Sequence, residues 1–416
     1  MRISTIQAFN NGVAGIQRNY ANATRTQEQI STGNRILTPA DDPVASVRLL
    51  QLEQQQNVLT QYKDNLTAAN NSLTQEEVTL NSVNTVLQRV RELTVEAGNG
   101  VFSKADRQSI AAELGEREHE LLSLMNTRNA RGEYLFAGFQ GKTQPFVREG
   151  DGSYSYQGDE GQRKLQIASS QQLAISDSGK AVFEDVVNAG RLSLTDNSVT
   201  PAPAGMISGL QVEDEVAFTN FPAAGIQLDF DATDPLNYTL TTLPLPGTVT
   251  SGRLEEDKDT LLRFSGASFY INGTPPASSS FTIEGPDANP ATSPQNKVGI
   301  LNTIATLRQS LESATNSPEG NREVRDAIAL GITNLDHGIN TVDLTRGKIG
   351  ARLNIIDSTQ TDNEDVTLVN KSVQADLREL DYAEALSRLS FQSIVLEASQ
   401  QSYVKIAGLS LFNQLR

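Results

Sequence analysis

Few side chains of this chain are of the types that do acid–base, nucleophilic or metal chemistry. Its 416 residues include two histidines, His119 and His337, and no cysteine, so thiolate metal sites and cysteine nucleophiles are excluded. Both histidines lie in stretches with helical periodicity, where a solvated or helix-edge histidine is the ordinary interpretation. No P-loop, GxGxxG, HExxH or GxSxG motif occurs. The sequence therefore gives no anchor for phosphate binding or nucleophilic catalysis.

Carboxylates could bind a divalent cation, and they occur in three acidic groups. These groups are Asp229/Asp231/Asp234, Glu255/Glu256/Asp257/Asp259 and Asp362/Glu364/Asp365. A calcium loop needs oxygen ligands at alternate positions, a glycine at the sharp turn and a distal bidentate glutamate, and none of the groups has this set. We interpret them as solvated loop charge and expect no metal and no cofactor.

Two further carboxylates, Asp41 and Asp42, lie together in the segment TPADDP at 38–43. Thr38 or Asp42 can cap a helix that starts here. Pro39 or Pro43 suits its first position, and aspartates favour the positive end of the helix dipole. Because this helix-cap motif explains the pair without catalysis, the sequence predicts that the chain is not an enzyme.

The composition limits the partners and the export route. The formal net charge of -16 argues against a nucleic-acid partner, because neutralising phosphates needs clusters of Lys and Arg, and none occurs. No run of 18 apolar residues is present, so we expect no membrane insertion. The first thirty residues also lack the unbroken apolar run of a cleaved signal peptide. If the protein leaves the cell, we expect a route without a conventional signal.

The two ends of the chain are predicted to be amphipathic helices that a lone subunit leaves partly uncovered. The first ends at Gly33 and has apolar residues at helical steps, which are Ile3, Ile6, Phe9, Val13, Ile16, Tyr20 and Ile30. The last helix carries Leu386, Leu389, Ile394, Leu409, Leu411, Phe412 and Leu415. Both are poor in charge, and propensity alone rarely sustains a helix in water. We therefore expect these residues to form an assembly interface that sister molecules complete.

Long helices and a β-rich insertion are predicted between the two ends. One helix runs from the cap motif to Gly98, Ser103–Asp106 resembles a capping box that opens another, and a hairpin is expected around Tyr154. Helices resume near 297, and a final helix is expected from about Val366 to the C-terminus. In between, 11 of the 15 prolines lie in 201–294, apolar residues alternate, and Asn272-Gly273 is expected to turn a hairpin.

The predicted fold is mainly α with an inserted β-rich domain, and the N- and C-terminal segments form a long antiparallel helical bundle or coiled coil. We expect 1–38 plus 382–416 to be a terminal coiled-coil assembly domain. Residues 39–189 plus 297–381 are expected to form a rod-like helical bundle with a β-hairpin. Residues 190–296 are expected to be an inserted β-rich outer domain.

Several stretches of the sequence resemble the bacterial flagellin family. MRIST at the N-terminus and ISTGNRILTPADDPVAS at 30–46 look like its N-terminal signature, and LDYAEALSRLSFQSIVLEASQQ at 380–401 resembles its C-terminal one. GEYLFAGFQGKTQPF at 132–146 and KIAGLSLFNQLR at 405–416 are similar to the hook-associated protein 3 family. The resemblance covers 1–185 and 297–416 in order and spacing, and it gives no match for 190–296.

The resemblance implies a structural component of the bacterial flagellum that connects hook to filament. It also implies export through the flagellar type III apparatus and a place outside the cell, at the hook–filament junction. The implied partners are hook-associated protein 1, flagellin, the export apparatus and an export chaperone that holds the C-terminal helix. Subunits are expected to form a homo-oligomeric ring.

Three other functions stay open. A flagellin filament subunit is the nearest alternative, and purified protein that grew long filaments unaided would favour it. An enzyme lodged in the insertion is the second, which a hydrolase screen with added metals would detect. A secreted coiled-coil adhesin is the third, and a deletion strain that swims normally but fails to attach would favour it.

Overall fold

The computed structural model describes residues 2–99, 102–286 and 295–412. Contacts divide the chain into two compact units, Met1–Leu66 with Asp357–Arg416 and Thr67–Ile356, which we call the terminal unit and the central unit. Two long helices, α2 (Pro43–Ala97) and α6 (Pro318–Arg378), have residues in both units. The expected division into three domains stays a prediction.

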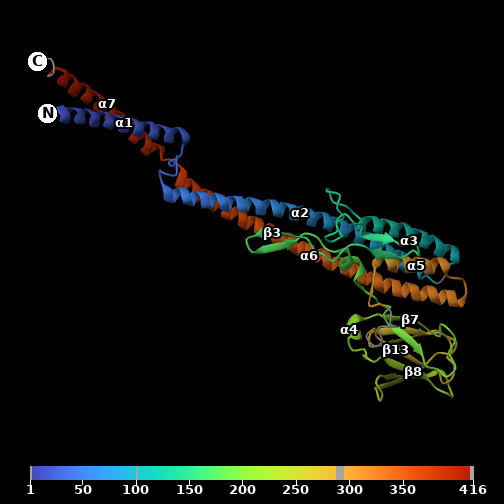
Figure 1. Cartoon of the computed structure of the whole chain (residues 1–416). Coiled ribbons are helices and arrows are strands. Elements are labelled where there is room, and N and C mark those ends of the chain that lie inside the picture. The colour runs from blue at the N-terminus through green and yellow to red at the C-terminus, as the bar shows by residue number, and fades with distance from the viewer. Residues whose placement is uncertain (1, 100–101, 287–294, 413–416) are drawn as a thin grey trace. The chain divides into compact units, whose positions relative to one another are not determined.

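The terminal unit pairs the first and last helices of the chain, α1 (Arg2–Thr32) and α7 (Tyr382–Phe412), which run antiparallel (Figure 1). The ring centroids of Phe9 and Tyr403 lie 5.1 Å apart, and Asn19 Nδ2 donates to Ser399 Oγ at 3.2 Å. Most buried or half-buried side chains of α7 follow alternating steps of four and three, and these are Ala385, Leu389, Gln392, Leu396, Ser399 and Tyr403. This is the spacing of a coiled-coil seam, so the predicted antiparallel pairing of the chain ends is confirmed.

In the central unit α2 and α6 also run antiparallel. Polar pairs connect them in reversed order along the two helices, namely Arg91 with Asp336, Asn84 with Asp343 and Glu77 with Arg346. From Ala69 onward α2 buries a residue at alternating steps of four and three as far as Ala97. α6 buries one side chain every seven residues, at Ile328, Leu335, Val342, Ile349 and Ile356. These two stripes form the long core of the unit.

Two shorter helices, α3 (Lys104–Met125) and α5 (Ile300–Ser313), pack against each other in the same unit. The predicted capping box at the start of α3 is confirmed, because the Ser103 hydroxyl accepts from Asp106 N and the Asp106 carboxylate accepts from Ser103 N. Leu114 and Leu121 of α3 and Leu307 of α5 are buried.

Short strands line these helices and lead into the insertion. β1 (Phe146–Arg148) and β2 (Tyr154–Tyr156) form the predicted hairpin, and β3 (Lys164–Ala168) pairs with β4 (Gln171–Ala174). After the π-helix η1 (Lys180–Glu184), β5 (Val186–Val187) pairs with β14 (Lys297–Val298) and forms the stem of the insertion. The expected helix near 297 therefore begins later, because 297–298 are strand and α5 starts at Ile300.

The insertion is a sandwich of two antiparallel sheets around one apolar core. Its elements are β6 (Ser193–Asp196), β7 (Ile207–Val212), α4 (Glu215–Phe218), β8 (Ile226–Phe230), β9 (Asn237–Thr242), β10 (Val249–Arg253), β11 (Thr260–Phe264), β12 (Ala267–Ile271) and β13 (Ser280–Glu284). One sheet has the order β10-β9-β8-β13-β6 and the other β11-β12-β7. Leu228 and Phe281 of the first sheet and Phe269 of the second belong to the shared core.

Two further details of the predicted elements are wrong. Asn272-Gly273 turns no hairpin, because β12 pairs with β11 and β7 whereas β13 lies in the other sheet. The tight turn is Ser265-Gly266, whose positive φ angles of 43° and 79° suit a two-residue hairpin between β11 and β12. The final helix is also not one element, because α6 runs on to Arg378 and the Asp381 carboxylate, accepting from Ala383 N at 2.9 Å, caps a new helix.

Candidate assembly surface of the terminal helices

Helix α7 packs one face against α1 and leaves apolar side chains exposed elsewhere on its surface. Apolar side chains of α7 that are more than half exposed include Tyr382, Leu386, Phe391, Ile394 and Val404. At about 100° per residue, the last four lie on the half of α7 away from the coiled-coil seam, and Tyr382 lies about 60° from the centre of the seam. We call these five residues the α7 flank. Scattered exposed apolar residues are ordinary, but a row of them along one helix face marks an interaction surface.

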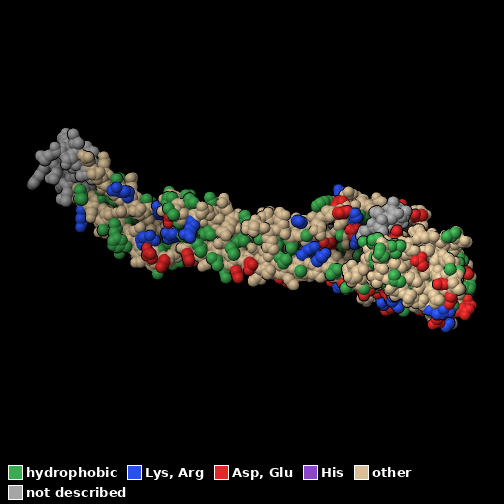
Figure 2. All heavy atoms as spheres, turned by 90° about the horizontal axis from the view of Figure 1, so that it is seen from below, with side chains coloured by type: hydrophobic (Ala, Val, Ile, Leu, Met, Phe, Trp, Pro, Cys, Tyr) green, Lys and Arg blue, Asp and Glu red, His purple; other side chains and the backbone are tan. Residues whose placement is uncertain are grey.

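The parts of α2 and α6 that belong to the terminal unit continue this character. Their exposed apolar side chains are Val44, Val47, Leu50 and Val58 on α2 and Val366, Leu368 and Val369 on α6. Figure 2 shows apolar side chains at the surface, between charged ones, in the part of the molecule next to the grey terminal residues. The terminal unit therefore has more apolar surface than its own helices cover.

The seam between α1 and α7 is made largely of small and polar residues. A side chain at Gly12 would lie 3.2 Å from Tyr403 Cδ2, so the tyrosine packs against bare backbone of α1. The polar pair of Asn19 and Ser399 lies further along the seam, and the next buried position of α1 is Thr26. Each such position contributes less apolar burial than a leucine would.

Some of the predicted interface residues are half-buried, and others are exposed. Half-buried residues are Val13, Ile16, Ile30 and Leu389, whereas Phe9, Tyr20, Leu386 and Ile394 are exposed by half or more. Ile3, Ile6, Leu409, Leu411 and Phe412 belong to α1 or α7, but their side chains lie outside the described part of the structure. Leu415 lies outside the described residues altogether. The assembly role of the whole set stays a prediction.

Three members of the α7 flank escaped the sequence reasoning, namely Tyr382, Phe391 and Val404. The prediction read Leu386, Leu389 and Ile394 as one stripe, although Leu389 is half-buried at a seam position and the other two are exposed. Spacing alone does not separate the faces, because on a helix Leu386 lies about 60° from Leu389 and about 80° from Ile394. The seam is also hard to recognise in the sequence, because Gln392 and Ser399 weaken its apolar pattern.

In the helix-cap motif Asp42 caps α2, whereas Asp41 binds the linker that precedes the helix. Asp42 Oδ1 accepts from Ala45 N at 2.9 Å and Pro43 is the first residue of α2, so these two open the helix. Thr38 is not the cap: its N–H and its hydroxyl donate to the Asp41 carboxylate at 3.1 and 2.9 Å. Pro39 precedes the helix and is not its first residue.

Asp41 organises the linker between α1 and α2. Its carboxylate accepts from Leu37 N at 3.0 Å and from Thr38, and it pairs with Arg25 of α1. The hydrogen bond from Thr38 N–H is the largest cause that lowers the pKa of Asp41 to about 2, and Leu37 and Arg25 lower it further. Asp41 is thus held ionised as a structural acceptor, which supports the prediction that the aspartate pair is not catalytic.

The two linkers of the terminal unit are bonded to each other through their backbones. Arg35 N donates to Arg378 O at 2.8 Å, and Leu380 N donates to Gly33 O at 3.0 Å. Gly33 has a φ of +70° and its N–H bonds Gln29 O at 2.8 Å, which confirms the predicted left-handed end of α1. The entry of α7 and the exit of α1 are therefore fixed to one another.

Comparison with known proteins gives this surface a context. The model of the bacterial flagellin N-terminal helical region matches residues 3–141. Flagellar hook-associated protein 3 of Escherichia coli is 26% identical over 414 residues, which cover 99% of either chain. The same protein of Salmonella typhimurium is 34% identical over 205 residues, which are 49% of this chain and 61%, less than two thirds, of that protein.

The chain is a homologue of flagellar hook-associated protein 3. A solved structure of hook-associated protein 3 from Legionella pneumophila has the same fold, with a TM-score of 0.64 at 23% identity over 79% of this chain and 98% of that one. Flagellins and filament proteins also match, but over 23% to 31% of this chain. The comparisons therefore support a structural component of the flagellum, which associates with other flagellar components outside the cell, and they support flagellin itself less.

The residues that could do chemistry are dispersed in this hook-associated protein 3 homologue. His119 is exposed on α3, and His337 Nδ1 on α6 lies 2.9 Å from Val187 O. Among the described residues, no three His, Asp or Glu side chains are placed to hold a metal ion. The described helices include none that is long and apolar enough to cross a bilayer.

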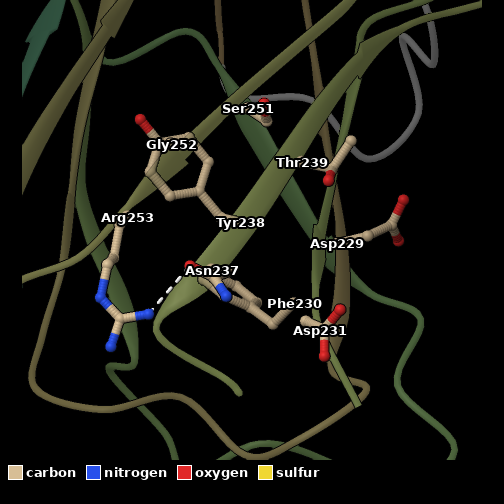
Figure 3. A pocket seen from close by; sticks show the side chains of 9 residues that line it. All are labelled: Asp229, Phe230, Asp231, Asn237, Tyr238, Thr239, Ser251, Gly252 and Arg253. Carbon is tan, nitrogen blue, oxygen red and sulfur yellow. Dashed lines mark hydrogen bonds between the residues drawn. The ribbon is translucent and has the colours of Figure 1, made fainter. Parts of the chain in front are cut away.

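The insertion has a polar hollow on its surface, and charged side chains that line it are bonded to neighbouring residues of the insertion. It lies over β8, β9 and β10 and has a volume of about 470 Å³ (Figure 3). Arg253 there bonds Asn237 and pairs with Asp234, and the Asp229 carboxylate accepts from Gln227 at 2.9 Å. These groups hold the sheet together, so we assign the hollow no ligand.

Proposed function

We propose that the protein connects the flagellar hook to the filament, and that its α7 flank is the surface through which it assembles. The observation that carries the proposal is the row of exposed apolar side chains on α7, in a chain that aligns with hook-associated protein 3 over 99% of either sequence. A row of this kind is unfinished in the lone subunit and has to be covered by another molecule.

The energetics favour assembly over a disordered end. Each leucine or isoleucine side chain that is fully buried contributes on the order of 1.5–3 kcal/mol. Several positions of the α7 flank, together with those on α2 and α6, outweigh the loss of side-chain freedom on docking, which is about 0.5–1 kcal/mol per leucine or isoleucine. We take the partners to be neighbouring copies of the chain in a ring, hook-associated protein 1 on the hook side and flagellin on the filament side.

The same surface has to be protected before export. A cytoplasmic chaperone that covers the C-terminal helix would keep the α7 flank from premature association, and the protein would then leave through the flagellar type III apparatus. Copurification of a chaperone with the full chain, and its loss when Leu386 and Ile394 are both changed to Asp, would support this part of the proposal.

The junction role is tested by complementing a strain that lacks the gene for this protein. The wild-type chain is expected to restore swimming and to label the distal end of the hook. Leu386→Asp with Ile394→Asp is expected to abolish both, because it places charge on the α7 flank. Val199→Asp, on a fully exposed apolar residue of the insertion, is the matched control and should swim normally.

Two outcomes would contradict the proposal. Normal swimming of the double aspartate variant would show that the α7 flank is not an assembly surface. Purified wild-type protein that grows into long filaments without other components would favour a flagellin filament subunit instead.

A further inference from the structure

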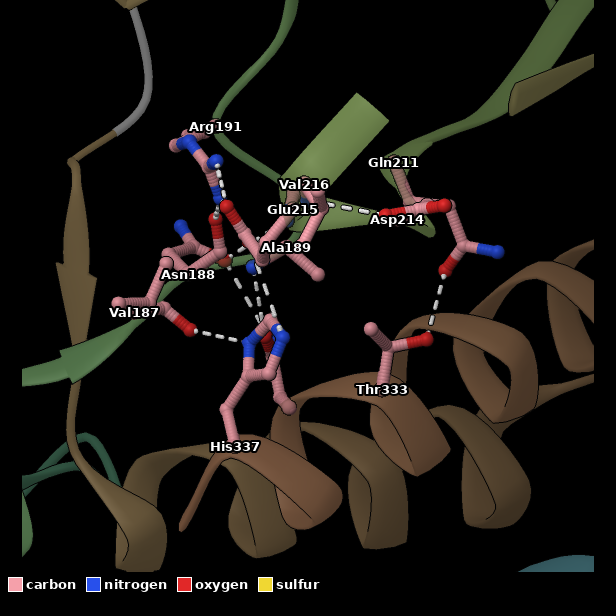
Figure 4. Close-up of polar contacts among 12 residues, drawn as sticks. Val187, Asn188, Ala189, Arg191, Gln211, Asp214, Glu215, Val216, Thr333 and His337 are labelled. Carbon is pink, nitrogen blue, oxygen red and sulfur yellow. Dashed lines mark hydrogen bonds and ion pairs between the residues drawn. The ribbon is translucent and has the colours of Figure 1, made fainter. Parts of the chain in front are cut away.

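The insertion is docked on the first turns of α6 through a strip of mostly polar residues. These α6 residues recur at helical spacing and are Arg322, Arg325, Asp326, Leu330, Thr333, Asn334 and His337. We call them the docking strip. Their partners lie on the three-stranded sheet and on the segment that leads from β5 into the insertion (Figure 4).

Arg325 makes the largest set of contacts at the start of the strip. Its guanidinium lies over the Tyr270 ring, 3.6 Å from the centroid, and donates to Asp259 Oδ2 at 2.9 Å. It also donates to Asn272 Oδ1 at 3.1 Å and to Ser208 Oγ at 3.3 Å. Asn272 is almost fully buried, so Arg325 reaches into the surface of the sheet.

A neighbouring arginine strengthens this end of the strip. Arg322 binds both oxygens of Asp259, at 2.9 and 3.0 Å, in the two-pronged geometry that fixes direction as well as distance. Asp259 therefore receives two guanidinium groups from adjacent turns of α6.

The other end of the strip holds the chain that enters the insertion. Asn334 Oδ1 accepts from Ala189 N at 2.7 Å, and His337 Nδ1 lies 2.9 Å from Val187 O. His337 Nε2 lies 3.7 Å from Glu215, whose carboxylate binds both outer nitrogens of Arg191 at 2.6 and 2.8 Å. Figure 4 shows His337 of α6 pointing toward Val187 and Glu215, with Arg191 on the far side of Glu215.

Two glycines bring the backbone of the insertion close to the strip. A Cβ atom at Gly190 would lie 3.1 Å from the Leu330 side chain, and one at Gly209 would lie 2.9 Å from Asp326 Oδ1. Gly209 also has a φ of +61°, which most other residues avoid. Both positions would have to open the contact to accept a larger residue.

We infer that the docking strip fixes the insertion in one orientation on α6, and that Arg325 is the main positioning residue. A domain joined to its host by two strands is free to move unless an interface restrains it. Hydrogen bonds are directional, and contacts at both ends of a strip of about four helical turns block rotation about any single contact. The three-stranded sheet is thereby turned toward α6, and the outer face of the five-stranded sheet is the one presented to other molecules.

The inference concerns the subunit itself, so it stands or falls separately from the junction role. The chain has no cysteine, and two introduced cysteines can carry spin labels without background. Thr250→Cys on β10 and Ser109→Cys on α3 are exposed positions in the insertion and in the helical body. Pulsed electron-spin distance measurement on this labelled full chain is expected to give one narrow distribution.

Removing the contacts at both ends of the docking strip is expected to broaden the distance distribution between the two labels. The variant is Arg325→Ala with His337→Ala, and circular dichroism should still show both helices and strands. Arg117→Ala is the matched control, because this arginine forms ion pairs with Glu113 and Glu120 of its own helix, and it should keep the distribution narrow.

A distribution that is broad in the otherwise wild-type chain, or that stays narrow in the double variant, would overturn the inference. Asp259→Asn provides a second variant that leaves α6 unchanged, in case the double variant fails to fold. It removes the charge that Arg322 and Arg325 share and is expected to broaden the distribution as well, and a narrow distribution in this variant would also count against the inference.

Discussion

The terminal and central units differ in how much of their apolar surface they cover. Among the described residues, the terminal unit holds five buried apolar side chains, Ala45, Leu59, Leu66, Leu380 and Ala385, and the central unit holds 53. The large exposed apolar side chains are divided the other way, with 15 in the terminal unit and nine in the central unit, although the central unit is the longer of the two. The central unit therefore has a large apolar core of its own, whereas the terminal unit buries few apolar side chains and exposes many.

This difference suggests that the two units become ordered in different ways, the central unit by its own core and the terminal unit by binding other molecules. The central unit buries its own stripes and is expected to fold as a lone subunit. The terminal unit leaves apolar side chains exposed, and we propose that other molecules bury them. Binding of a partner to the folded form raises apparent stability by mass action, so the terminal helices should become rigid only in the assembled state. Four predictions test this contrast.

The same substitution is expected to have opposite consequences in the two units. Ile349→Asp places a carboxylate in the fully buried stripe of α6, which should cost more than about 4 kcal/mol and unfold the central unit. Ile394→Asp changes a residue that is 66% exposed and should alter the free energy of unfolding by less than about 0.5 kcal/mol. Urea unfolding of the purified chain measures both values, and comparable losses would remove the contrast.

Ion pairs should show the contrast as well. Arg308 of α5 pairs with Glu118, whose side chain is 2% exposed and also accepts from the Tyr154 hydroxyl. Arg308→Ala leaves this carboxylate buried without its cation and should cost about 3–5 kcal/mol. Arg25→Ala removes an arginine that is half exposed, and its loss should cost about 0–1 kcal/mol. Equal losses in urea unfolding would show that the terminal unit is as well packed as the central one.

The sequence was sufficient for the parts of the molecule in which local pattern and packing agree. The start of α2 at Pro43, the Ser103 capping box, the left-handed Gly33 and the antiparallel chain ends follow from residue types alone. Such features depend on neighbours within a few residues, so no long-range contact is needed to predict them.

The failures came from contacts between distant segments. Nothing near Asn272-Gly273 indicates that the next strand crosses to the other sheet, and nothing near Val366 indicates that α6 continues to Arg378. The acidic groups were read as solvated loop charge, yet Asp259 is bonded to two arginines of α6 more than sixty residues away. The two faces of α7 were merged for the same reason, because only the position of α1 distinguishes them.

The pH dependence of stability should come from the central unit. Burial raises the pKa of Glu184 to about 7, helped by Asp185, and burial next to Asp177 raises the pKa of Glu76 well above its usual value. A carboxyl whose pKa is raised by folding contributes its stability below its ordinary pKa of about 4.5 and loses it as the pH rises through the folded value. The central unit should therefore lose stability between about pH 4.5 and 7.

Glu184→Gln removes one of these titrations and should flatten that slope, with a gain of about 1–3 kcal/mol at pH 8 relative to the wild type. Asp41 of the terminal unit has the opposite sign: its pKa of about 2 gives stability that is lost only when the pH falls below about 4. Thermal unfolding at pH 5 and 8 compares wild type and variant. Parallel losses in the two proteins would show that Glu184 does not carry the effect.

The smallest effect is expected within α1 itself, at two glycines of different conformation. Gly33 has a φ of +70°, and a Cβ there would lie 2.9 Å from the Tyr382 hydroxyl, so Gly33→Ala should destabilise the end of α1 by about 1–2 kcal/mol. Gly15 lies inside the helix with nothing within 4 Å of its Cβ position, so Gly15→Ala should instead stabilise α1 by about 0.5–1 kcal/mol. Amide hydrogen exchange along α1 in the full chain resolves both changes. Because α1 has few buried contacts that could mask a backbone effect, the two alanines should shift its exchange in opposite directions, and a shift in the same direction would mean that packing, rather than backbone conformation, controls the order of this helix.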